Sequence, residues 1–303
     1  MKIDNAIMIQ PSPFSLNGKP ARVSAHGGHS GDYCQHARDS LDEIVEAYHA
    51  RNFAWVGVTE HIPAVDDRFL YPDERSAGWT SRTLQERFTR YMTHCRNLQA
   101  AYRGRMPIYV GMETEAYSGA IDYAISLRND LQPDYMVGSV HHVADIPIDM
   151  NMDEYARAIS DCGGMMALYT AYFDLQYEMI QRLKPDVVGH FDLIRIFDPD
   201  YPARLKTRPI WERICRNLEC IAASELKLDV NVRALLKGGY EPYPSRPILE
   251  KACDLGISVL PGDDSHSVDT VGAHIDEGIQ FIQSIGLSTQ WTSPIKTINT
   301  ISL

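Results

Sequence analysis

The sequence predicts an α/β fold in which strands separated by helices close into a barrel. Two observations support this prediction. Short apolar runs typical of strands alternate with segments of helical periodicity, an order that favours a parallel sheet. Histidines and carboxylates follow many of these runs, and the C-terminal ends of parallel strands meet on one face. A ring of such residues indicates a barrel with its functional site at that face.

The expected elements follow one another in a regular order. An irregular arm over residues 1–20 precedes the first strand-like run at 22–26, and a helix begins near Asp39 or Ser40. Residues 62–81 lack periodicity and contain several turn formers, so we expect a long loop over the barrel mouth. Further strands are expected at 53–59, 107–113, 134–140, 186–191, 226–232 and 257–263. Further helices are expected at 82–103, 152–183, 208–224 and 248–256.

Composition narrows the class of protein. The 303 residues, 44% of them hydrophobic, can form a sizeable core, and we expect one domain over 1–303 because no linker or repeat interrupts it. The net charge of −11 argues against a broad nucleic-acid or membrane surface. No apolar stretch approaches the roughly 20 residues that span a bilayer. The polar N-terminus is unlike a signal peptide and the six cysteines are scattered, which is typical of a cytoplasmic protein.

Nine residues of metal-ligand type lie in or just after the strand-like runs. Such side chains resist unpaired burial, and histidine with carboxylate is a usual ligand set for zinc, manganese and iron. One histidine at a strand end is more often structural, but nine such residues together indicate a polynuclear metalloenzyme. The nine are His26, His29, His36, His61, Glu113, His141, His190, Asp264 and His266. Cys34 lies among them, either as a packing residue or as a further ligand.

Six ordered motifs resemble the polymerase-and-histidinol-phosphatase (PHP) superfamily of metal-dependent phosphoesterases. The resemblance covers roughly residues 22 to 270. Segments 138–149, 189–197 and 241–249 are similar to its histidinol-phosphate phosphatase branch. The six motifs are His26 with His29, Thr59-Glu60-His61, Gly111-Met112-Glu113, Ser139-Val140-His141, Gly189-His190 and Asp264-Ser265-His266.

The resemblance implies a distorted TIM-like (β/α)7 barrel with two or three divalent transition metal ions, namely zinc, manganese or iron. Clustered cations lower the pKa of a bridging water and clamp phosphate oxygens, so Glu113 and Asp264 would belong to the catalytic machinery. The implied ligand sets are His26, His29, Glu113 and Asp264 for a first metal, Glu113 with His141 and His190 for a second, and His36, His61 and His266 for a third.

The first motif departs from the family pattern. The family has two histidines separated by one residue, whereas His26 and His29 are separated by Gly27 and Gly28. One interpretation is a bulge at the glycines, which lets both histidines reach the metal. The other is that His29 alone matches and Gly27 occupies the place of the other ligand.

Two arginines and one histidine are candidates for substrate contacts. Arg195 lies on the loop leaving a predicted strand, and we expect its guanidinium to bind the substrate phosphate. The alternative is a surface ion pair with Asp192 or Asp198. Arg233, after another strand, is a second candidate for the phosphate. His142 is expected either to contact the substrate and donate a proton to the leaving group, or to support the metal ligands.

Together these features predict a phosphomonoesterase that hydrolyses L-histidinol phosphate, with a small phosphorylated molecule as its partner rather than nucleic acid or a membrane. A phosphoesterase for a sugar phosphate or nucleotide is one alternative, and a regulatory PHP module without catalysis is another. Degenerate modules should have lost ligands, whereas all nine positions here carry a ligand-type residue. A metal-dependent amidohydrolase would need a lysine after a middle strand, and none ends the runs at 137–140 or 186–189.

Overall fold

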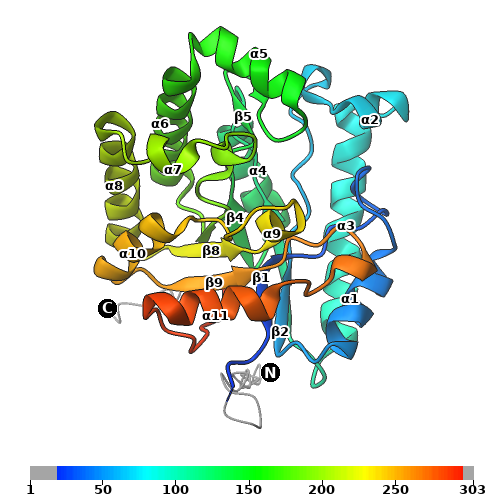
Figure 1. The fold of residues 1–303 in the computed structure, drawn as a ribbon. Helices are drawn as coiled ribbons and strands as arrows, with labels where there is room; N and C mark the ends of the chain where they lie inside the picture. The colour runs from blue at the N-terminus through cyan, green and yellow to red at the C-terminus, as the bar shows by residue number, and fades with distance from the viewer. Residues whose placement is uncertain (1–18, 296–303) are drawn as a thin grey trace, which may run out of the picture.

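A computed structural model describes residues 19–295, in which seven parallel strands form one nearly closed barrel (Figure 1). Neighbouring strands pair in chain order. The last strand returns to the first, where the backbone N–H of Asp264 donates to the carbonyl of His26 at 2.8 Å. The expected α/β barrel is confirmed. Its strands are β1 Val23–Gly27, β2 Trp55–Val58, β3 Ile108–Glu113, β4 Tyr135–Gly138, β7 Val187–Val188, β8 Lys227–Asn231 and β9 Val259–Gly262.

Helices pack around the barrel (Figure 1). The first long one begins where the sequence predicts, because the Ser40 hydroxyl accepts from the N–H of Glu43 and the Glu43 carboxylate accepts from the N–H of Ser40. These helices include α1 Leu41–Ala50, α3 Ser81–Ala101, α5 Met152–Cys162, α6 Met165–Leu183, α8 Arg208–Ala223 and α10 Arg246–Asp254. All overlap expected helical segments, although α3 begins one residue and α10 two residues earlier than expected. The expected arm over 1–20 lies, except for its last two residues, outside the described range.

Besides the single-turn helices α7 Tyr201–Arg204 and α9 Arg233–Leu236, two long helices were not expected, α4 Ala120–Leu131 and α11 Ile275–Ile285. Neither begins with a side-chain cap. Gly119 and His274 precede them with positive φ angles, so the usual signal of a helix start is absent from the sequence. Packing of their apolar faces on the barrel decides their formation instead.

The prediction of a long loop at 62–81 was wrong in part. This segment contains a 3₁₀ turn, η1 Asp67–Phe69, and a short helix, α2 Pro72–Ser76. The Glu74 carboxylate accepts from the N–H of Tyr71 at 2.8 Å, which closes the first turn of α2. The ring of Phe69 stacks on Tyr117 with centroids 4.0 Å apart. Turns this short show no periodicity, and a local core holds the segment against the barrel.

A short hairpin follows β4 and was not expected. Its strands, β5 His142–Val143 and β6 Ile146–Pro147, pair antiparallel. Strands of two residues are too short to show the alternation of apolar and polar residues by which a strand is recognised in a sequence. The hairpin places His142 beside the site described below, and the chain leaving it carries Asp149 to the cavity.

The barrel interior is filled by a tyrosine rather than left open. The Tyr135 hydroxyl donates to the carbonyl of Ala25 at 2.7 Å, across the barrel. A Cβ atom at Gly57 would lie 1.9 Å from this hydroxyl, and one at Gly111 would lie 2.7 Å from the ring. Glycine in β2 and β3 therefore makes room for Tyr135, which packs beneath the strand ends that carry the site.

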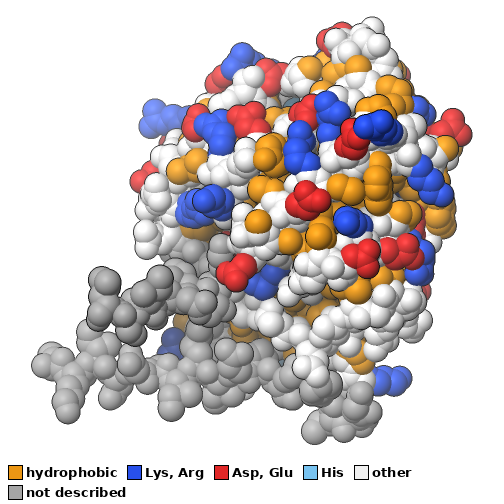
Figure 2. Space-filling model, turned by 90° about the vertical axis from the view of Figure 1, so that its left-hand side faces the viewer, with side chains coloured by type: hydrophobic (Ala, Val, Ile, Leu, Met, Phe, Trp, Pro, Cys, Tyr) orange, Lys and Arg blue, Asp and Glu red, His pale blue; other side chains and the backbone are white. Residues whose placement is uncertain are grey.

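The outer surface carries charges of both signs, as expected from the composition. Among residues 19–295, no helix is long and apolar enough to cross a membrane. On the face at the left-hand side of Figure 1, basic and acidic side chains are interleaved (Figure 2). That face offers no continuous basic stripe of the kind that binds nucleic acid.

Candidate metal centre

Glu113 lies at the centre of the strand-end residues. It is the last residue of β3 and its side chain is buried. Its Oε1 lies 3.2 Å from His26 Nε2 and 3.0 Å from His190 Nε2, and its Oε2 lies 3.2 Å from His61 Nδ1. His141 Nε2 is also 3.2 Å from Oε1. One carboxylate therefore faces four imidazoles from four different strand ends.

The strand-end residues form two adjoining groups. The deeper group, called the inner cluster, is buried around Glu113 and includes residues expected for the first two metals. It consists of His26, His29, Glu113, His141, His190 and Asp264. The second group, called the outer cluster, lies nearer the surface. It consists of Cys34, His36, His61 and His266, whose candidate ligand atoms all lie within 4.8 Å of one another.

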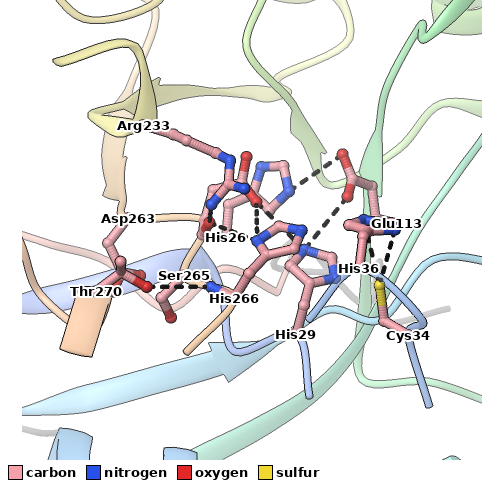
Figure 3. Close-up of polar contacts among 12 residues, drawn as sticks. His26, His29, Cys34, His36, Glu113, Arg233, Asp263, Ser265, His266 and Thr270 are labelled. Carbon is pink, nitrogen blue, oxygen red and sulfur yellow. Dashed lines mark hydrogen bonds and ion pairs between the residues drawn. The ribbon is translucent and has the colours of Figure 1, made fainter. Parts of the chain in front are cut away.

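The insertion in the first motif is accommodated by backbone geometry. The pairing of β1 with β2 shifts register between Ser24 and Gly27, and Gly28 has a φ angle of +73°. His26 reaches Glu113, while His29 Nε2 lies 3.3 Å from Asp264 Oδ1 (Figure 3). The bulge thus brings both histidines into the inner cluster, and ligation by both stays a prediction.

A layer of carboxylates behind the histidines was missed by sequence reasoning. Asp229 Oδ2 lies 2.8 Å from His26 Nδ1, and Glu115 Oε2 lies 3.1 Å from His141 Nδ1. Glu60 Oε2 lies 3.5 Å from His29 Nδ1. Such partners fix the orientation and tautomer of metal-binding imidazoles. A signal was present, since Glu60 and Glu115 adjoin the motifs and Asp229 is an acid within a strand-like run.

The inner carboxylates are ionised. Burial alone would raise the pKa of Glu113, but His26, His61 and His141 outweigh burial and hold it well below its usual range. Burial would likewise raise the pKa of Asp264, and His26 and His29 hold it low. Two anionic side chains at the centre of a ring of imidazoles form a site suited to divalent cations.

Several buried nitrogen and oxygen atoms are placed to coordinate a metal ion and form no hydrogen bond. Among the described residues, His26 Nε2, both ring nitrogens of His29, His61 Nδ1 and Glu113 Oε2 have no hydrogen-bond partner. Unpaired buried polar atoms are costly, and coordination to cations would satisfy those that face the centre of the site, whereas His29 Nδ1 faces Glu60. The donor set therefore fits divalent metal ions.

A cavity of about 450 Å³ opens over the two clusters. Arg233 lines it, at the start of the short helix α9 Arg233–Leu236, and its Nη1 donates to the carbonyl of Asp264 at 2.7 Å. Lys237 lines the same cavity. These two cationic side chains line the cavity together with residues of both clusters.

Arg195 does not line this cavity. It lies in the 3₁₀ turn η2 Leu193–Arg195 and is 5% exposed. Its Nε lies 3.2 Å from Asp192, and its Nη2 donates to the carbonyls of Glu241 and Pro242. The guanidinium also packs 4.3 Å from the ring centroid of Tyr243. Arg195 thus forms a buried ion pair with Asp192 rather than a surface pair, and its contact with phosphate stays a prediction that its place outside the cavity lining does not favour.

His142 is buried beside the inner cluster and does not line the cavity. Its Nδ1 lies 3.2 Å from Glu115 Oε2, the same oxygen that faces His141. Its ring packs edge-on against Tyr117, with centroids 5.1 Å apart. This position favours support of Glu115 and His141 over direct contact with a substrate.

The chain is similar in sequence and in fold to known proteins. The PHP domain model matches residues 27–233. The histidinol-phosphatase of Saccharomyces cerevisiae is 32% identical over 300 residues, covering 87% of this chain and 89% of the yeast protein. A solved structure from Listeria monocytogenes has a TM-score of 0.73 at 21% identity, covering 84% of this chain and 99% of that one. A histidinol phosphate phosphatase from Lactococcus lactis, solved with zinc, L-histidinol and phosphate, has a TM-score of 0.66 at 18% identity, covering 88% and 94%.

Proposed function

The chain belongs to the PHP domain family, and we propose that it is a metal-dependent histidinol-phosphatase, a phosphoric monoester hydrolase. The observation that carries the proposal is the position of Glu113, which faces imidazoles from four strand ends. One carboxylate in that position can serve two cations. Curated relatives over most of the chain carry the same activity in their names.

Divalent ions would be held by the two clusters, with Glu113 shared between two inner positions and a third position in the outer cluster. Zinc, manganese and iron all suit ligands of this kind. When bound, such ions lower the pKa of water and neutralise charge on phosphate oxygens. The protein's own contribution is to hold the imidazoles in fixed orientations through Asp229, Glu115 and Glu60.

Arg233 is proposed as the phosphate-binding side chain, in place of Arg195. It is tethered to the Asp264 carbonyl at one nitrogen and lines the cavity next to the metal ligands. A guanidinium makes charge-assisted contacts to phosphate oxygens and does not deprotonate. Arg195 is proposed to position Tyr243, which lines the cavity and on which the Arg195 guanidinium packs.

The cavity also carries acidic side chains that suit an amine-bearing substrate. Asp149, after the hairpin, and Asp73, in α2, line it together with Asn151. L-Histidinol phosphate has an amino group and an imidazole at the end away from its phosphate. A cavity with both cationic and anionic side chains complements such a molecule, whereas a sugar phosphate offers the carboxylates only neutral hydroxyl groups.

The test is phosphate release from a panel of small phosphate esters by purified protein reloaded with zinc or manganese. We expect L-histidinol phosphate to be hydrolysed with the highest kcat/KM, and chelation to abolish the activity. A metal-loaded protein that releases no phosphate from any ester would contradict the proposal. Preference for a sugar phosphate or nucleotide would replace the substrate but keep the reaction.

A further inference from the structure

The outer cluster contains a thiol that the metal-ligand motifs do not include. Cys34 is buried, and its sulfur points to the ring of His36, 3.3 Å from Nδ1 and 3.2 Å from Nε2 (Figure 3). The rings of His61 and His266 lie beside that of His36, with centroids 5.4 and 5.0 Å from it. One sulfur and three imidazoles thus surround one point in space.

These separations are those of a tetrahedral site. With Zn–S of about 2.3 Å and Zn–N of about 2.0 Å, a tetrahedral angle places sulfur and nitrogen about 3.5 Å apart. The candidate atoms of Cys34, His36, His61 and His266 all lie within 4.8 Å of one another, and the nearest sulfur–nitrogen distances are slightly shorter than this value. The four residues are therefore close enough for one ion to bind them together.

The backbone holds Cys34 in place before any metal binds. Its N–H donates to the carbonyl of Ser30 at 2.8 Å, which makes a tight turn. A few residues on, the N–H of Arg38 donates to the carbonyl of His266 at 2.8 Å and ties the Cys34–His36 segment to the strand end that carries His266. The ring of His61, beside that of His36, completes the set. The four residues therefore form a pre-arranged group.

We propose that Cys34 is the fourth protein ligand of the outer metal, bound as a thiolate, so that this site is Cys-His₃ whereas the inner sites are built from histidine and carboxylate. The inference rests on the outer metal position of the proposed function. A thiolate is a soft ligand that favours zinc or iron over manganese. Loading with a manganese–zinc mixture should therefore place zinc in the outer site first.

The direct test is X-ray absorption at the zinc edge of the fully loaded protein. We expect a sulfur contribution at about 2.3 Å, averaged over all bound zinc ions. It should disappear in Cys34→Ala and persist in Cys95→Ala. Cys95 is a matched control because it is also buried and lies in α3, in none of the ligand groups among the described residues. Cobalt(II) loading offers a second reading, a sulfur-to-cobalt charge-transfer band with the same dependence on Cys34.

Two results would overturn the proposal: a native protein with zinc bound and no sulfur in its environment, or a sulfur signal that survives Cys34→Ala. Should that variant fail to fold, Cys34→Ser keeps the size of the side chain and replaces sulfur by oxygen, and the native spectrum alone still decides. The readout is independent of turnover. Loss of phosphate release with the sulfur signal intact would count against the proposed function and not against the ligand.

Discussion

The inner and outer clusters adjoin each other but are built differently. The inner residues follow β-strands directly, are nearly all below 5% exposure, and have their imidazoles backed by Asp229, Glu115 and Glu60. The outer residues come mainly from loops. His36 is open to solvent with the Cys34 sulfur against its ring, and the His61 side chain is 21% exposed although its Nδ1 lies 3.2 Å from Glu113 Oε2. The carboxylates behind the inner imidazoles thus make the inner cluster more rigid than the outer cluster.

This difference predicts how tightly each metal is held. Imidazoles oriented by carboxylates lose little side-chain freedom on binding, whereas the solvent-exposed ring of His36 loses more, although the backbone that carries it is tied in place. We therefore expect a chelator to remove the outer metal first and the inner metals more slowly. The four substitutions below test this comparison, in order of their expected effect on metal content.

Glu113→Ala should have the largest effect, because one side chain faces both inner positions. We expect loss of both inner metals and a fall in kcat of about 10³-fold or more, since the ions supply several kcal/mol of the catalysis. Elemental analysis and phosphate release measure the two effects. Full retention of metal by a folded variant would show that Glu113 does not bridge.

His36→Ala should cost about one equivalent of metal and leave the inner pair in place. The reason is that, among the described residues, the contacts of His36 are with the outer cluster and the ring of Tyr71, and none is with a residue of the inner cluster. Metal content after dialysis gives the answer, with His94→Ala as control, since His94 lies on α3 and pairs with Asp42 outside both clusters. Loss of all metals would mean that the clusters do not bind independently.

Asp229→Asn tests the carboxylate layer. It removes the charge behind His26 but keeps the shape, and loss of such a partner weakens metal binding about 10- to 100-fold. Competition with a graded series of chelators measures this affinity. Asp198→Asn serves as control, because Asp198 is a buried carboxylate paired with Arg204 away from the cavity. If the two variants bind metal with equal affinity, the carboxylate behind His26 does not strengthen metal binding. The distinction between the inner and outer clusters would then be lost.

Arg233→Ala should leave metal content unchanged and lower kcat/KM about 10- to 100-fold, the loss of a charge-assisted contact of about 1.5–3 kcal/mol. Steady-state kinetics with L-histidinol phosphate measure this fall in kcat/KM. Arg195→Ala is the comparison: removing one partner of its buried ion pair should lower the free energy of unfolding by about 3–5 kcal/mol. Wild-type kinetics in Arg233→Ala would reject its phosphate role.

The sequence by itself determined the order of strands, most of the helices and the nine ligand-type positions. These rest on local patterns: apolar runs, helical spacing, caps such as Ser40, and polar residues at run ends. Periodicity could not show α2 or the β5–β6 hairpin, because each is shorter than the pattern that reveals an element.

Only the tertiary structure decided which residues meet. Arg195 and Arg233 follow strands in the same way in the sequence, yet one is turned into a buried pair with Asp192 and the other lines the cavity. Asp229 reaches His26 across 203 positions of sequence, because barrel closure brings β8 and β9 beside β1. Cys34 likewise joins His266 only through that closure. The spacing of residues along the chain determines on which face of a strand or helix a side chain lies. The distances between side chains on different strands depend on how the barrel closes.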